Sequence, residues 1–323
     1  MDAVPILVVA DLVKRFELPR SGLRGPRPVV HAVDGVSFAI GRGETLGLVG
    51  ESGCGKSTIA RLITRLVDTT SGRIELDGED ITHVTRARMR PRRRKLQMVF
   101  QDPYASLNPR QTAGDIVGEP LSVHGLARGS ELEARVASLF KRVGLRADQM
   151  VNYPAQFSGG QRQRLAIARA LVLDPGIIVA DEPVSALDVS TQAQVVNLLA
   201  DLQEERGLSY LFIAHDLAVV RHISRRVAVM YLGRIVEIAP AEALFSAPLH
   251  PYTRALLAAV PVPDPARRRT ARAVPLGEVP SPIDPPRGCH FHPRCPLAME
   301  RCRLEAPILR DVGDGRTVAC HAV

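Results

Sequence analysis

Apolar residues in the first hundred positions alternate between short strand-like runs and one helical repeat. Residues 44–49 predict a buried strand, and further strand signals cover residues 6–16, 33–40, 72–78 and 96–100. After residue 58, apolar positions recur at the spacing of one helix face: Ile59, Leu62, Ile63, Leu66 and Val67. This part of the chain predicts an α/β fold.

Strand signals vanish between about residues 102 and 174, where helical patterns such as residues 131–143 and 162–171 dominate. Apolar runs return at residues 177–182 and 209–214, and both predict buried parallel strands. Two further strands are predicted around Leu232-Gly233. Beyond Pro240, recurrent prolines between residues 261 and 286 predict an extended, irregular segment.

The length and net charge of the chain indicate its number of domains and the kind of partner it binds. A chain of 323 residues suggests about two domains, and its net charge of +8 indicates an anionic partner. Much of the excess lies in residues 86–95, for which a solvated loop is the plainer interpretation. Phe100 is the one aromatic residue beside this run, which disfavours nucleic acid. No apolar run long enough to span a membrane and no signal-like start are present, so we expect a cytoplasmic protein.

A phosphate-binding loop is predicted between the strand at 44–49 and the helix that follows, because the sequence reads G-x-x-x-x-G-K-S there. Its backbone N–H groups and the helix N-terminus suit phosphate, Lys56 adds a positive charge, and the Ser57 hydroxyl suits Mg²⁺. A plain glycine-rich turn is the alternative. The predicted nucleotide ligands are Gly50, Glu51, Ser52, Gly53, Cys54, Gly55, Lys56, Ser57 and Thr58.

Polar residues follow three other predicted strands. Asp181 and Glu182 end the run at 177–182, where Asp181 suits the Mg²⁺ shell and Glu182 suits a catalytic base. Gln101 and His215 end two more strands, so all four side chains are expected at one edge of the sheet. A solvated acidic turn is the alternative for Asp181 and Glu182.

The segment 158–160 and Cys54 each have two possible interpretations. Ser158-Gly159-Gly160 at the start of a predicted helix is either a second anion cradle or a plain N-cap. Cys54 lies at a helix N-terminus beside Lys56, which favours a reactive thiolate; a small residue chosen for fit is the other interpretation.

The chain resembles an ABC-type ATPase domain over about residues 5–240. The motifs that carry this resemblance occur in the expected order: the phosphate loop, Gln101, Phe157 to Gln161, Asp181-Glu182, residues 185–188 and His215. Phe157 stands where leucine is usual. The resemblance implies an ABC-type P-loop NTPase fold, with a RecA-like core, an antiparallel β subdomain and a helical subdomain at about 102–174. The first domain would cover residues 1–240.

The same resemblance implies roles for the site residues, with catalysis by Glu182, His215 and Lys56. Two ATPase domains would sandwich two ATP molecules. The Ser-Gly-Gly-Gln segment of each chain, called the signature, would face the γ-phosphate held by the other chain. Phe16 would stack on adenine, and Ser57, Gln101 and Asp181 would hold Mg²⁺. Asp188 would communicate across the dimer, and the signature residues are Ser158, Gly159, Gly160 and Gln161.

Residues 241–323 narrow the family. The segments 250–252, 277–282 and 288–296 resemble the C-terminal extension of oligopeptide/dipeptide importer ATPases, F-type subunit. This implies peptide import, a paralogous D-type ATPase as heterodimer partner and two transmembrane permease subunits. It also implies an extracytoplasmic solute-binding protein and a peripheral position at the cytoplasmic face of the membrane. Alternatives are an importer of nickel, opines or glycosides, or a soluble ABC ATPase acting on ribosomes or DNA.

Four of the five cysteines fall in the last 35 residues, as C-x5-C-x6-C-x17-C. This spacing matches neither short zinc knuckles nor ferredoxins and does not choose a metal. The family resemblance implies a structural [4Fe-4S] cluster, with zinc as the alternative. Its ligands would be Cys289, Cys295, Cys302 and Cys320.

Overall fold

A four-stranded antiparallel sheet forms one layer of the protein. The computed structural model describes residues 4–19, 27–259 and 277–323. The strand order is β2-β1-β4-β5, and the register of β1 against β2 runs from Leu7 opposite Ile40 to Glu17 opposite Val29. The strands are β1 (Leu7–Glu17), β2 (Val29–Ile40), β4 (Ser71–Leu76) and β5 (Glu79–Asp80).

The second sheet has eight strands in the order β11-β12-β10-β9-β3-β8-β7-β6. From β9 to β6 every neighbouring pair is parallel, so the carboxyl ends of these five strands share one edge. The strands are β3 (Thr45–Val49), β6 (Leu96–Val99), β7 (Ile177–Asp181), β8 (Ser209–Ile213), β9 (Arg226–Tyr231), β10 (Arg234–Pro240), β11 (Arg310–Asp311) and β12 (Thr317–Val318).

Helix α1 (Lys56–Ile63) buries Ile59 and Ile63 in a hydrophobic core to which strands of both sheets contribute. It ends earlier than the apolar spacing predicts, because Arg65 adopts a positive φ of 54°. Leu66 is consequently 51% exposed. Including Leu66 and Val67 in the helix was therefore wrong.

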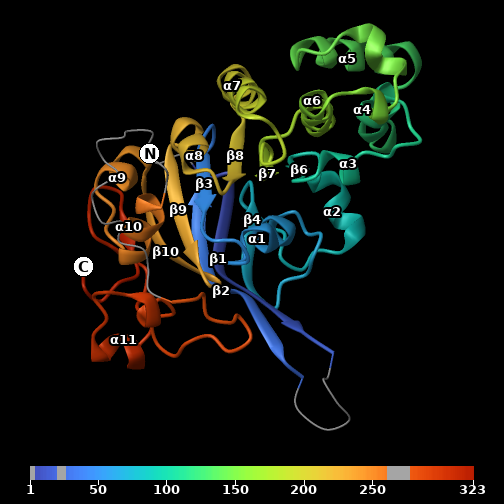
Figure 1. The fold of residues 1–323 in the computed structure, drawn as a ribbon. Coiled ribbons are helices and arrows are strands. Elements are labelled where there is room, and N and C mark those ends of the chain that lie inside the picture. Colours follow the sequence, from blue (N-terminus) through green and yellow to red (C-terminus); the bar gives the residue numbers. More distant parts are fainter. Residues whose placement is uncertain (1–3, 20–26, 260–276) are drawn as a thin grey trace, which may run out of the picture.

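Four helices form a separate group between β6 and β7, which Figure 1 shows at the end of the molecule away from the C-terminal segments. Among the described residues, 102–174 contain no strand, as predicted. Short 3₁₀ turns at residues 147–151 and 154–156 join the last two helices. The helices are α3 (Pro103–Ser106), α4 (Ala113–Val123), α5 (Gly129–Arg142) and α6 (Gly159–Leu171).

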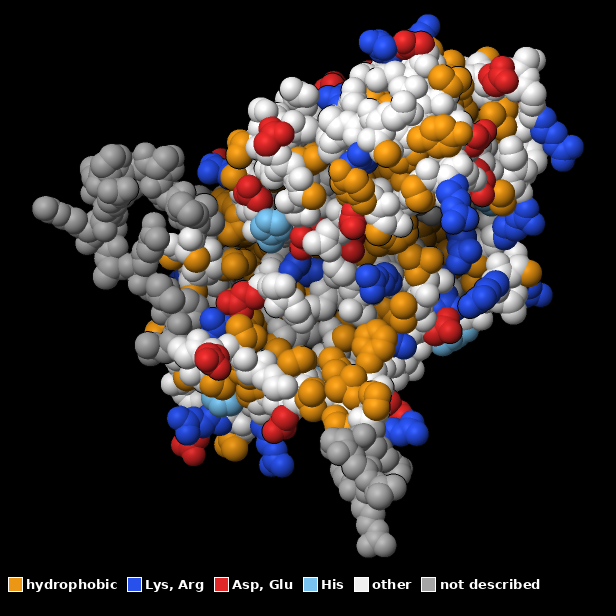
Figure 2. Space-filling view, turned by 45° about the vertical axis from the view of Figure 1, so that its right-hand side comes forward, with side chains coloured by type: hydrophobic (Ala, Val, Ile, Leu, Met, Phe, Trp, Pro, Cys, Tyr) orange, Lys and Arg blue, Asp and Glu red, His pale blue; other side chains and the backbone are white. Residues whose placement is uncertain are grey.

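The basic run is a short helix, α2 (Arg86–Arg92), and not the loop that its charge favoured. The Thr85 hydroxyl accepts a hydrogen bond from the Arg88 N–H at 3.4 Å, and Met89 anchors the helix in the core. Arg86, Arg88 and Arg90 are exposed. Lys and Arg side chains gather along one side of the face shown in Figure 2.

The C-terminal residues are partly helical and join the core sheet. Helices α9 (Ala241–Ser246) and α10 (Pro251–Ala258) follow β10, ahead of the proline-rich stretch that predicted an irregular segment. Residues 280–286 are irregular as predicted, whereas the prolines at 261, 263, 265 and 275 lie outside the described residues. The segment continues through a 3₁₀ turn (His292–Arg294) and α11 (Glu300–Leu304) to β12, which pairs with β10.

The remaining helices, α7 (Val189–Arg206) and α8 (Leu217–Ile223), follow β7 and β8. Across residues 4–19, 27–259 and 277–323, none of the helices combines the length and apolar character needed to cross a membrane.

Candidate functional site

Four chain segments meet at the carboxyl edge of the parallel strands. The phosphate loop follows β3, Gln101 follows β6, Asp181 ends β7, and His215 follows β8. Because these strands are adjacent and parallel, the fold brings together side chains that lie far apart in the sequence. This is the edge at which open parallel sheets bind ligands.

Backbone geometry explains the glycines of the loop. Gly55 has a φ of 113°, and a Cβ there would lie 2.1 Å from the carbonyl oxygen of Ala32. A Cβ at Gly50 would lie 2.1 Å from the carbonyl oxygen of Met230. Both positions therefore exclude side chains. The Lys56 ammonium donates to the carbonyls of Gly50 at 2.8 Å and Glu51 at 3.0 Å.

Ser57 and Asp181 are joined directly. The Ser57 hydroxyl donates a hydrogen bond of 2.9 Å to Asp181 Oδ1. Burial raises the pKa of Asp181, with a smaller contribution from the negative charge of Glu182, against the lowering effects of Ser57, Arg61 and Lys56. A hydroxyl beside a carboxylate supplies the hard oxygen ligands that Mg²⁺ prefers, so the pair fits the predicted metal.

Two side chains converge on Glu182. The Gln101 amide donates to Glu182 Oε2 at 2.9 Å, and His215 Nδ1 lies 3.3 Å from the same oxygen. Glu182 has a positive φ of 47°, an uncommon conformation for a residue with a side chain. Strained backbone of this kind gathers at functional sites. Glu182 is half-buried, while His215 and Gln101 are exposed.

The signature residues lie on the helical group and cap α6. The Ser158 hydroxyl accepts from the Gln161 N–H at 3.3 Å, and Gln161 Oε1 accepts from the Ser158 N–H at 3.0 Å. A Cβ on Gly160 would lie 2.4 Å from Thr191 Cγ2, and one on Gly159 would lie 3.6 Å from Leu187. Within the described ranges, no hydrogen bond or ion pair links residues 158–161 to residues 50–58.

Asp188 caps α7 and is fully exposed. Its carboxylate accepts hydrogen bonds from the Ser190 hydroxyl and from the N–H and hydroxyl of Thr191. These bonds lower the pKa of Asp188 to about 2, with Ser190 contributing most. Asp188 therefore stays ionised beside the start of α6, since its partner Thr191 lies against Gly160.

Phe16 lies near the end of β1 and is 37% exposed. The Lys14 ammonium sits 4.8 Å from the centre of its ring. An exposed aromatic face on this strand is suited to stacking on a nucleobase.

Comparison with known proteins decides the family. Residues 33–185 match the ABC transporter family, and residues 236–302 match the C-terminal region of oligopeptide/dipeptide transporters. The chain is 57% identical to a Sinorhizobium fredii protein described as "Probable peptide ABC transporter ATP-binding protein y4tS", over 98% of this chain and 89% of the relative. The chain belongs to the ATP-binding proteins of peptide ABC transporters.

Two further comparisons agree with this family. A di/tripeptide transport ATP-binding protein of Pseudomonas aeruginosa is 50% identical over 98% of this chain and 97% of its own length. The dimeric structure of an ATP-binding cassette bound to ADP and phosphate superposes with a TM-score of 0.64 at 31% identity, covering 73% of this chain and 98% of that chain. The ABC-type P-loop fold predicted from the motifs is confirmed.

Cys54 of this ABC protein lies in the predicted phosphate loop, where burial opposes formation of a thiolate. The residue is only 6% exposed. Burial raises the pKa of its thiol, which outweighs the lowering effect of Lys56, whose ammonium lies 3.8 Å from the sulfur. The expectation of an activated thiolate was wrong because desolvation exceeds the attraction of one nearby cation.

The four C-terminal cysteines lie near one another without forming a metal-binding group. Burial, together with the charges of the other three thiols, raises the pKa of Cys289 to about 11. The Cys289 N–H donates to the carbonyl of Cys302 at 2.8 Å, and all four thiols are free of disulfides. Across the described ranges, no group of three or more His, Cys, Asp or Glu side chains is arranged to hold a metal ion. The geometry therefore does not bear out the predicted cluster.

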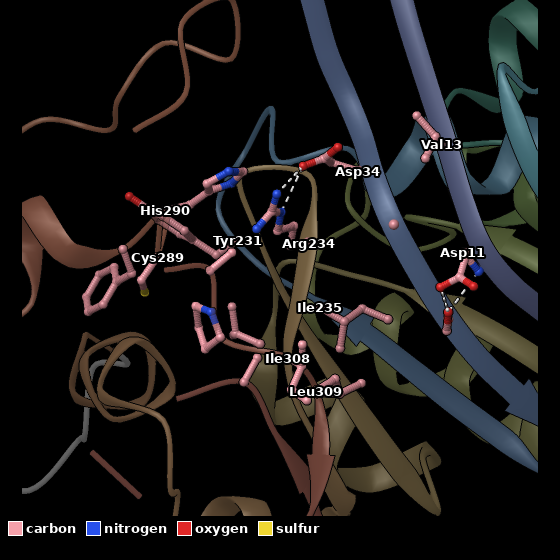
Figure 3. A pocket seen from close by; sticks show the side chains of 17 residues that line it. Asp11, Val13, Asp34, Tyr231, Arg234, Ile235, Cys289, His290, Ile308 and Leu309 are labelled. Carbon is pink, nitrogen blue, oxygen red and sulfur yellow. Dashed lines mark hydrogen bonds and ion pairs between the residues drawn. The ribbon is translucent and has the colours of Figure 1, made fainter. Parts of the chain in front are cut away.

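A cavity of about 510 Å³ is lined by one of these thiols, that of Cys289. Figure 3 shows Cys289 and His290 on one side and Asp11 and Val13 of β1 on the other. Arg234 of β10 pairs with Asp34 of β2 at 2.7 Å on its wall. The cavity thus marks the seam between the C-terminal extension and the antiparallel sheet.

Two contacts to the phosphate loop were not predicted. The guanidinium of Arg294 and the hydroxyl of Tyr252 both reach Glu51 from the C-terminal extension. Both residues lie in segments that resemble the family tail, but no local pattern connects them with residue 51 because their partners are more than 200 positions away.

Proposed function

We propose that this chain is the ATP-hydrolysing subunit that powers an ABC importer for peptides. One observation carries the proposal. Lys56, Asp181 and Glu182 meet at one sheet edge in a chain whose C-terminal region matches oligopeptide/dipeptide transporters. The residues at the sheet edge indicate ATP hydrolysis, and the match of the C-terminal region indicates peptides as the transported substrate.

The nucleotide would bind along this edge. The N–H groups of residues 50–58 and the Lys56 ammonium would hold the phosphates, and Phe16 would stack on the adenine. Ser57, Gln101 and Asp181 would hold Mg²⁺, which supplies charge neutralisation when bound. The 2.9 Å contact between Ser57 and Asp181 supports this assignment.

Glu182 would accept the proton of the attacking water, and His215 would contact the γ-phosphate. Gln101 and His215 both contact Glu182 Oε2. Since both contacts are made to Oε2, we assign the other carboxylate oxygen, Oε1, as the proton acceptor.

A second ATPase chain would complete the site. Among the described residues, Ser158, Gly159, Gly160 and Gln161 make no hydrogen bond to their own phosphate loop, and the face that they form with the start of α7 also carries Asp188. We propose that this face meets the phosphate loop of a D-type paralogue, making this chain the F-type subunit beneath two permease subunits. The heterodimer would lie at the cytoplasmic face of the membrane and be supplied by an extracytoplasmic solute-binding protein.

We propose two domains, residues 1–240 with the helical subdomain at about 102–174, and residues 241–323. The soft thiolate donors of Cys289, Cys295, Cys302 and Cys320 suit a [4Fe-4S] cluster, or zinc as the alternative. Iron, sulfide and zinc analysis of anaerobically purified protein tests it, and protein free of all three rejects it.

Uptake of a labelled dipeptide tests the function. Cells that lack this chain but retain its permeases should import the dipeptide only when the wild-type gene is restored. Glu182→Gln is the matched control, since it removes the proposed base while keeping the size of the side chain. Restored uptake of nickel ion without uptake of dipeptide would contradict the proposed substrate class.

A further inference from the structure

The C-terminal extension holds the phosphate loop through an ion pair. Glu51 is the second residue of the loop, and its carboxylate accepts two hydrogen bonds from Arg294: Nη1 to Oε2 at 2.9 Å and Nη2 to Oε1 at 3.1 Å. The Arg294 side chain is 8% exposed and that of Glu51 is 27% exposed. A bidentate pair shielded from water fixes both partners more firmly than a surface ion pair does.

A second contact fixes the loop backbone. The Tyr252 hydroxyl accepts a hydrogen bond of 2.9 Å from the Glu51 N–H. This N–H belongs to the same peptide unit as the Gly50 carbonyl, which accepts from Lys56 at 2.8 Å. One peptide plane is therefore held by the extension on its nitrogen side and by Lys56 on its oxygen side.

Aromatic packing makes the two contacts one unit. Tyr252 of α10 packs against Tyr231 of β9, with ring centres 4.6 Å apart. Phe291 packs against both, at 5.2 Å from Tyr231 and 5.4 Å from Tyr252. Arg294 follows Phe291 within one 3₁₀ turn, and its N–H donates to the Phe291 carbonyl at 3.0 Å. The rings thus fix the distance between the two groups that hold Glu51.

We propose that Arg294 and Tyr252 are positioning residues for nucleotide binding, acting through Glu51. They hold the first turn of the phosphate loop in the shape that receives phosphates, so the extension contributes to ATP affinity in its own chain. The inference rests on the proposed ATP site and adds two side chains from outside the nucleotide-binding motifs. Neither residue touches the reacting atoms, so their loss should raise KM more than it lowers kcat.

Binding of the fluorescent analogue TNP-ATP to the full chain tests the proposal. Arg294→Ala should weaken binding about tenfold, and Tyr252→Phe, which removes only the hydroxyl, about threefold. At saturating ATP, kcat of both variants should stay within about twofold of wild type. Arg301→Ala is the matched control, because this arginine pairs with Glu305 in the same extension without contacting the loop.

A double-mutant cycle separates positioning from mere docking of the extension. In a Glu51→Ala background, Arg294→Ala should weaken binding no further. Equal weakening in both backgrounds, or undiminished affinity in a folded Arg294→Ala protein, would overturn the proposal. If Arg294→Ala does not fold, Tyr252→Phe decides alone, and unchanged affinity there rejects the inference. Wild-type protein that binds no TNP-ATP would instead reject the proposed function.

Discussion

The Ser57 hydroxyl donates a 2.9 Å hydrogen bond to the Asp181 carboxylate, across 124 positions of sequence. This bond ties the phosphate loop to the end of β7. It also partly stabilises a carboxylate that burial makes costly to ionise.

Asp181→Asn should raise the unfolding temperature at pH 7.5, measured without nucleotide or Mg²⁺. The folded-state pKa of Asp181 is raised by burial from an ordinary value of 3.8. The raised pKa of Asp181 therefore contributes stability at pH values below 3.8, and this contribution is lost as pH rises through the folded-state pKa. Asparagine removes the charge, so the gain should disappear in melts below about pH 4.

Asp188→Asn is the control with the opposite sign. The pKa of Asp188 is lowered to about 2 by hydrogen bonds from Ser190 and Thr191, so its ionised form stabilises the fold above the ordinary pKa. The variant should unfold at a lower temperature at neutral pH. A higher unfolding temperature for both variants would show that loss of charge alone is responsible.

Glu182→Gly should be more stable than Glu182→Ala by about 0.5–1 kcal/mol, although both should lose ATP hydrolysis. The φ of 47° at this position is strained for alanine and open to glycine. Urea unfolding of the two variants measures the difference. Equal stability would mean that residue 182 does not hold this backbone conformation in solution.

Cys54 should react slowly with thiol reagents at neutral pH. Its thiol is buried and its pKa is raised by that burial, so little thiolate is available. Mass mapping after brief treatment with a maleimide should show Cys54 unmodified in native protein and fully modified in urea. A variant with serine at the four C-terminal cysteines isolates the signal, and rapid native labelling would contradict the expectation.

His250 should make the protein less stable as pH falls from about 6.5 to about 4. Burial lowers the pKa of His250 to about 4, so in this window the unfolded chain binds a proton that the folded chain does not. The loss amounts to roughly 3 kcal/mol across the window. Chemical unfolding at several pH values measures it, and His250→Asn should show a shallower dependence.

Patterns within a few residues predicted most of the fold and most of the nucleotide edge. The strand before Gly50, the helix after it and the polar residues that end β6, β7 and β8 are all local signals. Parallel pairing then determined that Gln101, Asp181, Glu182 and His215 share one edge.

The errors arise where tertiary context outweighs a local signal. Arg65 breaks α1 with a positive φ although the apolar spacing continues. Burial outweighs Lys56 at Cys54. The pairing of Arg294 with Glu51 spans 243 positions and depends on three rings packing together, which no sequence window contains.

The pairing of β12 with β10 has a consequence during synthesis. Until Thr317 and Val318 emerge and pair with Ile238 and Glu237, β10 presents an open strand edge of buried, mostly apolar residues. Open edges recruit other chains. We therefore expect a nascent or truncated chain that ends after α10 to aggregate more readily than a chain in which β12 covers this edge.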